Sequence, residues 1–328
     1  MTQAATSTSP VLDLRLLETF VAVVEGAGMV GAAKQLHVTQ PAVSKSISQL
    51  EKQLGLALID RSQRPLRPTR AGQLLYRSAT SLLKEAQNIP NLLSMAAHDT
   101  MPRIRVGLVE SFTATGAPFV KAMQAMAQEV RISCSLTPEL ARGLKQWELD
   151  FVITSDMMED ESGLVRSTLM EEPFILVQPR NSDPVGDLDS LRQLPARTPF
   201  IRYTNRSMIG RTIDRYLSRA RVPTSNTLEF DTSTPLLQMV IAELGWAVTT
   251  PLCLLQSQAD RSSLRISALP GAPTRKLYLV HRSGDLGELP ERIFLLASNL
   301  LESLIARSFG QGDERILALI RFAEPTRD

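Results

Sequence analysis

The chain has 328 residues, 43% of them hydrophobic and 21% charged, a composition that fits two or three folded domains with a sizeable core in each. No run of about 18 apolar residues occurs, so no segment is predicted to span a membrane. The first ten residues, MTQAATSTSP, lack the basic and apolar parts of a secretion signal. We therefore predict a cytoplasmic protein, with residues 1–11 as a disordered tail.

The net charge of +2 conceals an asymmetry along the chain. Residues 1–95 carry ten Lys and Arg against six Asp and Glu, so this part has a charge of +4 and the rest has −2. Between Lys34 and Lys84 there are nine basic residues and two acidic ones. Positive charge concentrated in one small region is typical of a protein that contacts phosphate groups of nucleic acid.

A first helix is predicted over 14–25, and a second helix of small residues ends at a short break, His37-Val38. Thr39 is predicted to cap a third helix with its side-chain oxygen, and Pro41 fits the first turn of that helix. The third helix has an apolar face and, opposite it, a polar and basic face. The first face consists of Val43, Ile47, Leu50 and Leu54, and the second of Ser44, Lys45, Ser48 and Lys52. This pattern predicts a helix-turn-helix whose second helix enters the major groove of DNA.

After a short apolar segment, 56–60, the chain has a turn rich in arginine and proline. The residues are Arg61, Arg64, Pro65, Arg67, Pro68 and Arg70. Two short extended pieces joined by a basic turn predict a wing, whose arginines would hold the DNA backbone or the minor groove. A solvated basic loop without DNA contact is the alternative.

A long helix is predicted from Ala71, with Thr69 as its cap. Apolar residues recur in it at alternating spacings of four and three: Leu75, Ala79, Leu82, Ala86, Ile89 and Leu93. A heptad pattern of this kind requires a partner helix, so these residues predict a dimerisation face. Packing of the same face against the remainder of its own chain is the alternative.

From residue 103 onward, short apolar strands alternate with helices, which is typical of parallel α/β sheets. Strands are predicted at 103–109, 131–136, 150–154, 174–177, 200–203, 228–230, 246–249 and 276–281, and helices at 116–128, 139–146, 208–219, 235–244 and 290–308. The last strand and helix are predicted to return to the first of two α/β units. Beyond them, Ile316, Leu317 and Ile320 indicate a short helix.

Three segments in a fixed order carry a resemblance to a known family: AAKQLHVTQPAVSKSISQLE (32–51), LGLALIDR (54–61) and PTRAG (68–72). With WELDFVITSD (147–156), they make the chain resemble the LysR-type transcriptional regulators over about residues 12–309. The chain departs from the family at Gly28, where members usually have a Ser or Thr cap, so phosphate contacts made there by relatives are not expected here.

The resemblance implies a multidomain protein with a winged helix-turn-helix, a long linker helix and a periplasmic-binding-protein-like α/β effector domain of two lobes. The implied boundaries are 12–69 for the DNA-binding domain, 70–100 for the linker helix, 101–172 with 272–310 for lobe I, 173–271 for lobe II and 311–328 for a C-terminal extension. The implied partners are double-stranded DNA, a small-molecule effector, RNA polymerase and a second copy of the chain, as a homodimer or homotetramer. The expected DNA-binding residues are Thr39, Gln40, Pro41, Ser44, Lys45, Ser48, Arg61, Arg64 and Arg67.

In open α/β sheets, ligands bind at the carboxyl ends of the strands, beside helix N-termini. The predicted strand ends carry hydroxyl groups and an arginine, and the candidate effector-binding residues are Ser111, Thr113, Thr137, Arg202, Tyr203, Thr204, Ser207, Thr232, Ser233 and Thr249. Such groups suit a small anion, for which a carboxylate is the simplest choice. Capping of a helix is the alternative role for each of them.

No catalytic set, metal-ligand spacing or phosphate-binding loop is found, so no enzyme activity, cofactor or metal is expected. Cys134 and Cys253 are predicted to be buried free thiols. A redox switch, as in peroxide-sensing members of the family, would need a close reactive pair, which this spacing does not suggest. A further alternative is a small-molecule-binding protein whose helix-turn-helix makes protein contacts, and the basic bias of residues 34–84 argues against it.

Overall fold

The computed structural model describes residues 11–26, 28–63, 65–97, 101–196, 198–224, 228–284, 286–310 and 312–322. It divides into two compact units, Met1–Pro90 and Asn91–Asp328. The predicted tail lies outside the described residues, except for Val11.

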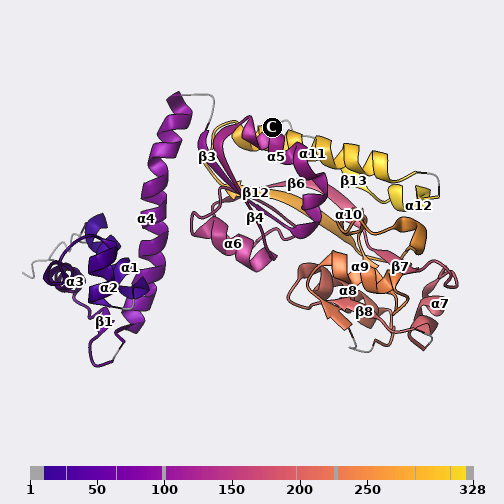
Figure 1. Cartoon of the computed structure of the whole chain (residues 1–328), viewed down its shortest axis with the longest axis horizontal. Coiled ribbons are helices and arrows are strands. Elements are labelled where there is room, and N and C mark those ends of the chain that lie inside the picture. The colour runs from indigo at the N-terminus through magenta and orange to yellow at the C-terminus, as the bar shows by residue number, and fades with distance from the viewer. Residues whose placement is uncertain are drawn as a thin grey trace, which may run out of the picture. The chain divides into compact units, whose positions relative to one another are not determined.

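The N-terminal unit packs three helices and a two-stranded wing against the start of a long helix (Figure 1). Its elements are α1 (Leu14–Glu25), α2 (Met29–Gln35), α3 (Gln40–Leu54), β1 (Ile59–Asp60), β2 (Arg67–Pro68) and α4 (Arg70–Ala97). The predicted apolar faces meet in one core, in which Phe20, Ile47 and Leu50 are fully buried. Periodic apolar residues therefore identified these helices correctly.

The ends of these helices are held in different ways. Asp13 accepts a hydrogen bond at 2.9 Å from the backbone N of Arg15 at the start of α1, and Thr69 Oγ1 accepts one at 3.0 Å from Gly72 at the start of α4. Thr39 occupies the cap position of α3, but its side chain accepts no hydrogen bond there, so that part of the prediction is wrong. Pro41 lies in the first turn, where a missing N–H leaves no internal bond unmade.

The glycines around the turn between α1 and α2 allow a close backbone approach. A Cβ atom on Gly31 would lie 2.1 Å from the carbonyl oxygen of Gly26, so no side chain fits there. Gly28 has φ 136°, a conformation that favours glycine, and it supplies no side-chain cap to α2. At Gly28 the departure from the family pattern thus coincides with a backbone conformation that favours glycine.

No single helix in the described part of the chain is long and apolar enough to cross a membrane. Taken together, α1 and α2 reach the required length and hydropathy, but a bend of 120° separates them. Their apolar side chains pack in the core of the N-terminal unit.

The larger unit contains a six-stranded sheet that forms lobe I. In spatial order its strands are β13 (Arg321–Phe322), β6 (Leu164–Pro173), β12 (Thr274–Arg282), β5 (Phe151–Thr154), β3 (Met101–Leu108) and β4 (Ala127–Cys134). Strand β3 runs parallel to β4 and β5, whereas β12 is antiparallel to both β5 and β6. The sequence pattern is typical of parallel α/β sheets, and β3, β4 and β5 are parallel, whereas β12 runs opposite to its neighbours, because β6 leads out of this lobe and β12 leads back.

Lobe II is built on shorter strands. Strand β7 (Ile175–Pro179) pairs antiparallel with β10 (Ala247–Thr249) and with β11 (Leu264–Ala268). Strand β8 (Ile201–Tyr203) pairs parallel with β9 (Leu228–Phe230), and a bridge between Phe200 and Trp246 connects the two sets. The return of the chain to lobe I through β12 occurs as predicted.

Helices cover both lobes (Figure 1). In chain order they are η1 (Glu110–Thr115), α5 (Gly116–Gln124), α6 (Thr137–Lys145), α7 (Leu188–Gln193), η2 (Leu194–Ala196), α8 (Met208–Arg219), α9 (Ser233–Ile241), α10 (Pro251–Gln256), η3 (Arg261–Ser263), α11 (Leu289–Ser308) and α12 (Glu314–Leu317). The predicted bounds of α8 and β9 agree with the structure. Strands β6 and β11 and helix α10 were not predicted, since β6 and β11 carry charged and polar residues that hide their apolar pattern.

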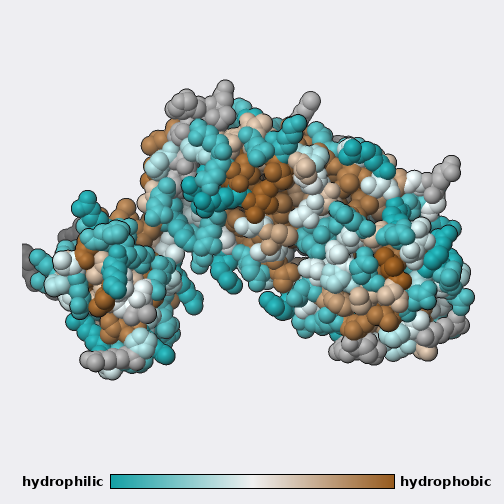
Figure 2. Space-filling view, in the orientation of Figure 1, coloured by the Kyte–Doolittle hydropathy of each residue, from teal (hydrophilic) through white to brown (hydrophobic). Residues whose placement is uncertain are grey.

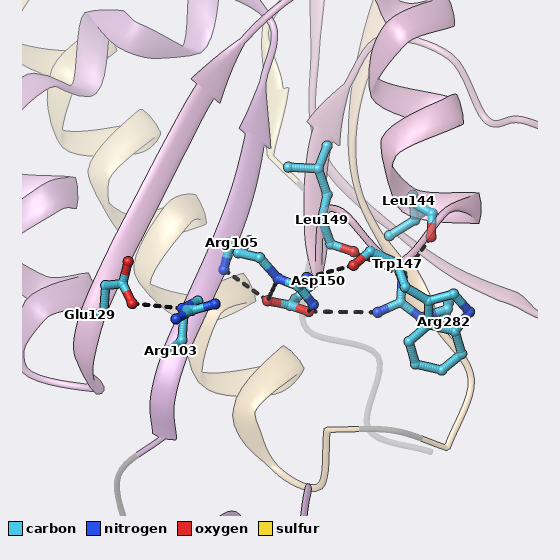
Figure 3. Close-up of polar contacts among 8 residues, drawn as sticks. All are labelled: Arg103, Arg105, Glu129, Leu144, Trp147, Leu149, Asp150 and Arg282. Carbon is cyan, nitrogen blue, oxygen red and sulfur yellow. Dashed lines mark hydrogen bonds and ion pairs between the residues drawn. The ribbon is translucent and has the colours of Figure 1, made fainter. Parts of the chain in front are cut away.

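A buried ion network lies beside the start of β5 (Figure 3). Asp150 is 2% exposed, and its carboxylate pairs with Arg105 at 2.6 Å and with Arg282 at 3.6 Å. The Arg282 guanidinium also lies 3.9 Å from the centre of the Trp147 ring. The WELD segment thus fixes β5 between β3 and β12, with two cations around one carboxylate.

The larger unit also carries apolar side chains on its surface. On the face seen in Figure 2, apolar patches are separated by hydrophilic surface. Val120 on α5 and Ile132 on β4 are 38% and 37% exposed, and β4 is an edge strand. Exposed apolar side chains beside a sheet edge are typical of a surface used for association.

Candidate functional site

Helix α3 divides cleanly into a buried and an exposed face. Val43, Ile47 and Leu50 are fully buried. The predicted DNA-contacting side chains lie on the other side: Thr39, Gln40, Pro41, Lys45 and Ser48 are exposed, and Ser44 is half-buried. The face has one positive charge near its N-terminal end and hydroxyl and amide groups that can both donate and accept hydrogen bonds.

The wing is attached to α3 by one acidic residue that the sequence analysis did not single out. Glu51 Oε1 accepts hydrogen bonds from the backbone N of Leu58 at 2.8 Å and of Ile59 at 3.2 Å. Its other oxygen pairs with Arg61 at 3.0 Å. Glu51 therefore fixes the first strand of the wing, and one of its arginines, to the helix. A lone acidic residue in an otherwise basic and polar α3 was the available signal.

The wing arginines differ in their surroundings. Arg61 is held by Glu51 and also donates to Ser48 Oγ at 3.4 Å, so its position is tied to α3. Arg67 is exposed on β2. Arg64 lies outside the described residues. Positive groups are thus presented on the wing as well as on α3.

The predicted dimerisation face of α4 is used in two ways. Leu75 and Ala79 pack into the core of the N-terminal unit, where Ala79 is 1% exposed. Further along, Leu82, Ile89 and Leu93 are 42%, 50% and 67% exposed, and Ala86 is half-buried. The first part of the stripe therefore packs within its own chain, and the second part leaves apolar side chains exposed.

A cavity of about 250 Å³ lies between the two lobes. Lobe I contributes strand ends and the start of η1, and lobe II contributes the loops that follow β8 and β9. Its lining includes Glu110, Ser111, Cys134, Ser135, Thr137, Ser155, Tyr203, Arg206, Ser207, Asp231, Thr232, Cys253 and Arg275. The position matches the general rule that ligands bind at the carboxyl ends of strands in α/β folds.

The structure brings half of the candidate effector residues to this cavity. Ser111, Thr137, Tyr203, Ser207 and Thr232 line it. The remaining candidates, Thr113, Arg202, Thr204, Ser233 and Thr249, are not among the lining residues. Thr249 lies directly behind the wall, where its hydroxyl hydrogen-bonds the Tyr203 hydroxyl at 2.8 Å and so positions that ring. Ser207 caps α8, accepting from Gly210 N at 3.0 Å, and thus has the capping role that was the alternative.

Arg202 was the cation expected to hold an anionic effector, and the structure does not place it in the cavity. Its guanidinium pairs with Asp214 and, at 3.6 Å, with Glu229. With its charge balanced by two carboxylates away from the cavity, Arg202 does not supply the expected anion site. Side chains alternate along a strand, so Tyr203 and Arg202 on β8 point to opposite faces, and of the two only Tyr203 lines the cavity.

A buried charged pair, of which Arg275 lines the cavity, was missed from the sequence. Arg275 on β12 is 6% exposed, and its Nε lies 3.4 Å from Oε1 of Glu172, which is 0% exposed. Arg275 also donates to Ser111 Oγ and, at 3.5 Å, to Cys253 Sγ. Burial raises the pKa of the Glu172 carboxyl, and the Arg275 charge offsets part of this effect. No short-range pattern marks this pair, because its members lie on the strands that leave and re-enter lobe I.

Comparison with known proteins decides the family. Residues 14–73 match the model of the bacterial regulatory helix-turn-helix proteins of the LysR family, and residues 97–296 match the LysR substrate binding domain. The chain belongs to the LysR family. It is a DNA-binding transcriptional regulator with an effector-binding domain, and the sequence-based recognition of this family is confirmed.

Individual relatives are distant. The transcriptional regulator PcaQ of Agrobacterium fabrum is 29% identical over 222 residues, covering 65% of this chain and 70% of the relative. A full-length OxyR variant from Pseudomonas aeruginosa has a TM-score of 0.63 at 19% identity, covering 89% of this chain and 95% of that one. Full-length CbnR complexed with its target DNA has a TM-score of 0.60 at 18% identity, covering 88% and 99%. The two structures share the fold of this LysR-family chain.

One of the two cysteines of this LysR-type regulator differs from the prediction. Cys253 is buried as expected, whereas Cys134 is exposed, because edge strand β4 has a neighbour on one side only. Both are free thiols and both line the interlobe cavity. Desolvation raises the pKa of the Cys253 thiol and, although Cys134 is exposed overall, that of its partly covered thiol as well. A raised pKa lowers the fraction of each thiol that is present as thiolate.

Proposed function

We propose that α3 and the wing form the DNA-contacting surface, with Thr39, Gln40, Pro41, Ser44, Lys45 and Ser48 facing bases and phosphates and Arg61, Arg64 and Arg67 holding the backbone. The observation that carries this proposal is the exposed polar and basic face of α3, to which Glu51 fixes the wing. A helix that buries its apolar face and exposes this one suits a major groove, and flanking arginines suit the backbone.

Salt dependence of DNA binding tests this surface. Replacing Lys45 and Arg67 together by alanine should weaken binding at all sequences and lower the slope of log K against log salt by about two units for each DNA-bound copy of the chain, since each lost phosphate contact removes about 0.9. Gel shift or fluorescence anisotropy with the upstream DNA of the gene's own locus, over a series of salt concentrations, gives both quantities.

Lys121→Ala is the matched control, since it removes a positive charge from α5 of the effector domain. We expect it to leave the slope as in the wild type. A double variant whose slope equals that of the wild type would place the DNA surface elsewhere. Failure of the wild type to bind any duplex at low salt would favour the alternative, in which the helix-turn-helix makes protein contacts.

The remaining roles follow from the two units. We propose that the interlobe cavity holds a small-molecule effector, and that a ligand with different affinities for two lobe arrangements changes the DNA-bound state. The exposed part of the α4 stripe, Leu82 to Leu93, pairs two copies of the chain in a dimer or tetramer. RNA polymerase is the further partner, the cell compartment is the cytoplasm, and the protein acts without catalysis. The domain boundaries are those of the sequence analysis.

A further inference from the structure

Glu110 reaches across the interlobe cavity and links the two lobes. It is the first residue of η1, in lobe I, and it lines the cavity. The backbone N of Ser233 in lobe II donates to its carboxylate, at 3.3 Å from Oε1 and 3.2 Å from Oε2. Ser233 begins α9, so the positive end of this helix dipole already faces a carboxylate of the protein. An incoming anion would find that position occupied.

The Glu110 carboxylate has no ion-pair partner among the described residues, where no Lys, Arg or His nitrogen lies within 4.0 Å of it. Arg275 lines the same cavity, but its guanidinium faces Glu172, Ser111 and Cys253. The charge of Glu172 therefore balances that of Arg275, and Glu110 keeps a negative charge without a direct counterion.

Burial raises the pKa of the Glu110 carboxyl, and the hydrogen bonds from Ser233 and the charge of Arg275 offset only part of that effect. The carboxylate is thus poorly solvated in the free protein. A cation placed beside it would gain a charge-assisted hydrogen bond in a site with little competing water. A carboxylate in the same position would meet like charge.

The lobe II side of the cavity carries side chains of positive and of negative charge. Arg206 and Asp231 line it, and both are exposed. A volume of about 250 Å³ is at the small end for ligand pockets, so the occupant is a small metabolite. An ammonium group near Glu110 leaves Arg206 available for a carboxylate of the same molecule.

We propose that the interlobe cavity recognises its effector through an ammonium group that ion-pairs with Glu110. This inference rests on the proposed role of the cavity as the effector site. It replaces the carboxylate expected from the sequence, because Arg202 is absent from the lining and Glu110 is present. The ammonium group belongs to a simple amine or to an amino acid, and probes with and without a carboxylate separate these sources.

Three probes of matched size test the proposal on the full-length protein by calorimetry and thermal shift: n-butylamine, norvaline and pentanoate. Norvaline carries both charged groups, n-butylamine lacks the carboxylate and pentanoate lacks the ammonium group. We expect n-butylamine or norvaline to bind in the millimolar range, and pentanoate to bind at least about tenfold more weakly, which corresponds to one step of 1.4 kcal/mol.

Glu110→Gln should weaken binding of the amine probes at least about tenfold, because the charge is lost while an oxygen remains for Ser233 N. Glu302→Gln, on the exposed side of α11, is the matched control and should bind as the wild type does. The unfolding temperature of the unliganded variants shows whether they are folded. If Arg206→Ala weakens norvaline and not n-butylamine, the ligand is an amino acid; if neither changes, it is a simple amine.

Amine binding that Glu110→Gln leaves unchanged would overturn the assignment. Binding of pentanoate in place of the amines would also overturn it, but would leave the cavity as the effector site. If no probe binds, both the ammonium site and the effector role of this cavity are contradicted. The DNA-binding proposal does not involve Glu110 and is tested separately by the salt series.

Discussion

The Asp150 carboxylate is the centre of a buried ion network in lobe I. Its carboxylate accepts from the Arg105 backbone N at 2.8 Å and pairs with the Arg105 and Arg282 side chains (Figure 3). Arg105 and Arg282 in turn donate to the backbone carbonyls of Trp147 and Leu149. Removing the charge would take away the carboxylate that these two largely buried guanidinium groups share.

We expect Asp150→Asn to lower the free energy of unfolding of the effector domain by about 3 kcal/mol, the usual cost of breaking a buried ion pair from one side. Tryptophan fluorescence in urea measures this well, because both tryptophans of the chain, Trp147 and Trp246, belong to this domain. Glu129→Gln is the control, since Glu129 pairs with Arg103 and Arg131 at the surface. A similar loss in both variants would contradict a special role for Asp150.

The residues exposed on the helix-turn-helix face could be predicted from the sequence, whereas the residues that line the cavity could be predicted only in part. Lys45 and Ser48 are exposed as expected, since their place on α3 follows from helical periodicity. Glu110 and Arg275 meet in one cavity although they are far apart in the chain, and no local pattern predicts their proximity. Arg202 was misassigned because one residue of strand register decides between the cavity and the opposite face.

Among the elements, α4 carries one apolar stripe whose two parts differ in exposure. Its first part completes the core of the N-terminal unit through Leu75 and Ala79, and its second part exposes Leu82, Ile89 and Leu93. The helix continues through Pro90 to Ala97. A heptad pattern in the sequence does not distinguish packing within a chain from pairing between chains, because both need the same spacing.

We expect Leu82→Asp to convert the oligomer to monomer at micromolar concentration, because an aspartate in a helix–helix seam is desolvated without a partner. Size-exclusion chromatography with light scattering gives the mass. Leu295→Asp on α11 is the control, since Leu295 is 41% exposed, close to the 42% of Leu82. A Leu82→Asp variant with the wild-type mass would refute the pairing role of this stripe.

Strand β6 illustrates an element that the sequence hid. It pairs along its whole length with β12, and β13 covers part of its other edge at Met170 and Glu171. Its sequence, LVRSTLMEEP, lacks a clean alternation because some polar residues, such as Glu172, point into the interior and find partners there. Buried ion pairs remove the signal on which strand prediction depends.

In the effector domain as a whole, the C-terminal extension forms a strap, which here means a segment that contacts both lobes. In the segment that follows α11, Asp313 pairs with Arg261 of lobe II at 2.8 Å, and Ile316 on α12 is 3% exposed. The chain then adds β13 to the lobe I sheet at the edge of β6. The segment thus contacts both lobes, and its predicted short helix is confirmed as α12.

Because this strap is packed, Ile316→Ala should lower the free energy of unfolding of the effector domain by about 2–4 kcal/mol. The matched control is Leu319→Ala, three residues further on, where the side chain is 46% exposed and a change within about 0.5 kcal/mol is expected. Urea denaturation followed by tryptophan fluorescence compares the two. Equal effects would show that the extension does not contribute to the core of this domain.

The sequence by itself determined the helix-turn-helix, the basic character of the N-terminal unit, the alternation of strands and helices and the family. These features depend on neighbours within a few turns of the chain, where helical and strand periodicity, caps and prolines act directly. The tertiary structure decided the mixed direction of the lobe I sheet, the burial of Arg275 with Glu172 and the position of Glu110 against α9. These features depend on which distant segments pack together, and the free energy of that packing is shared among many contacts that no short pattern records.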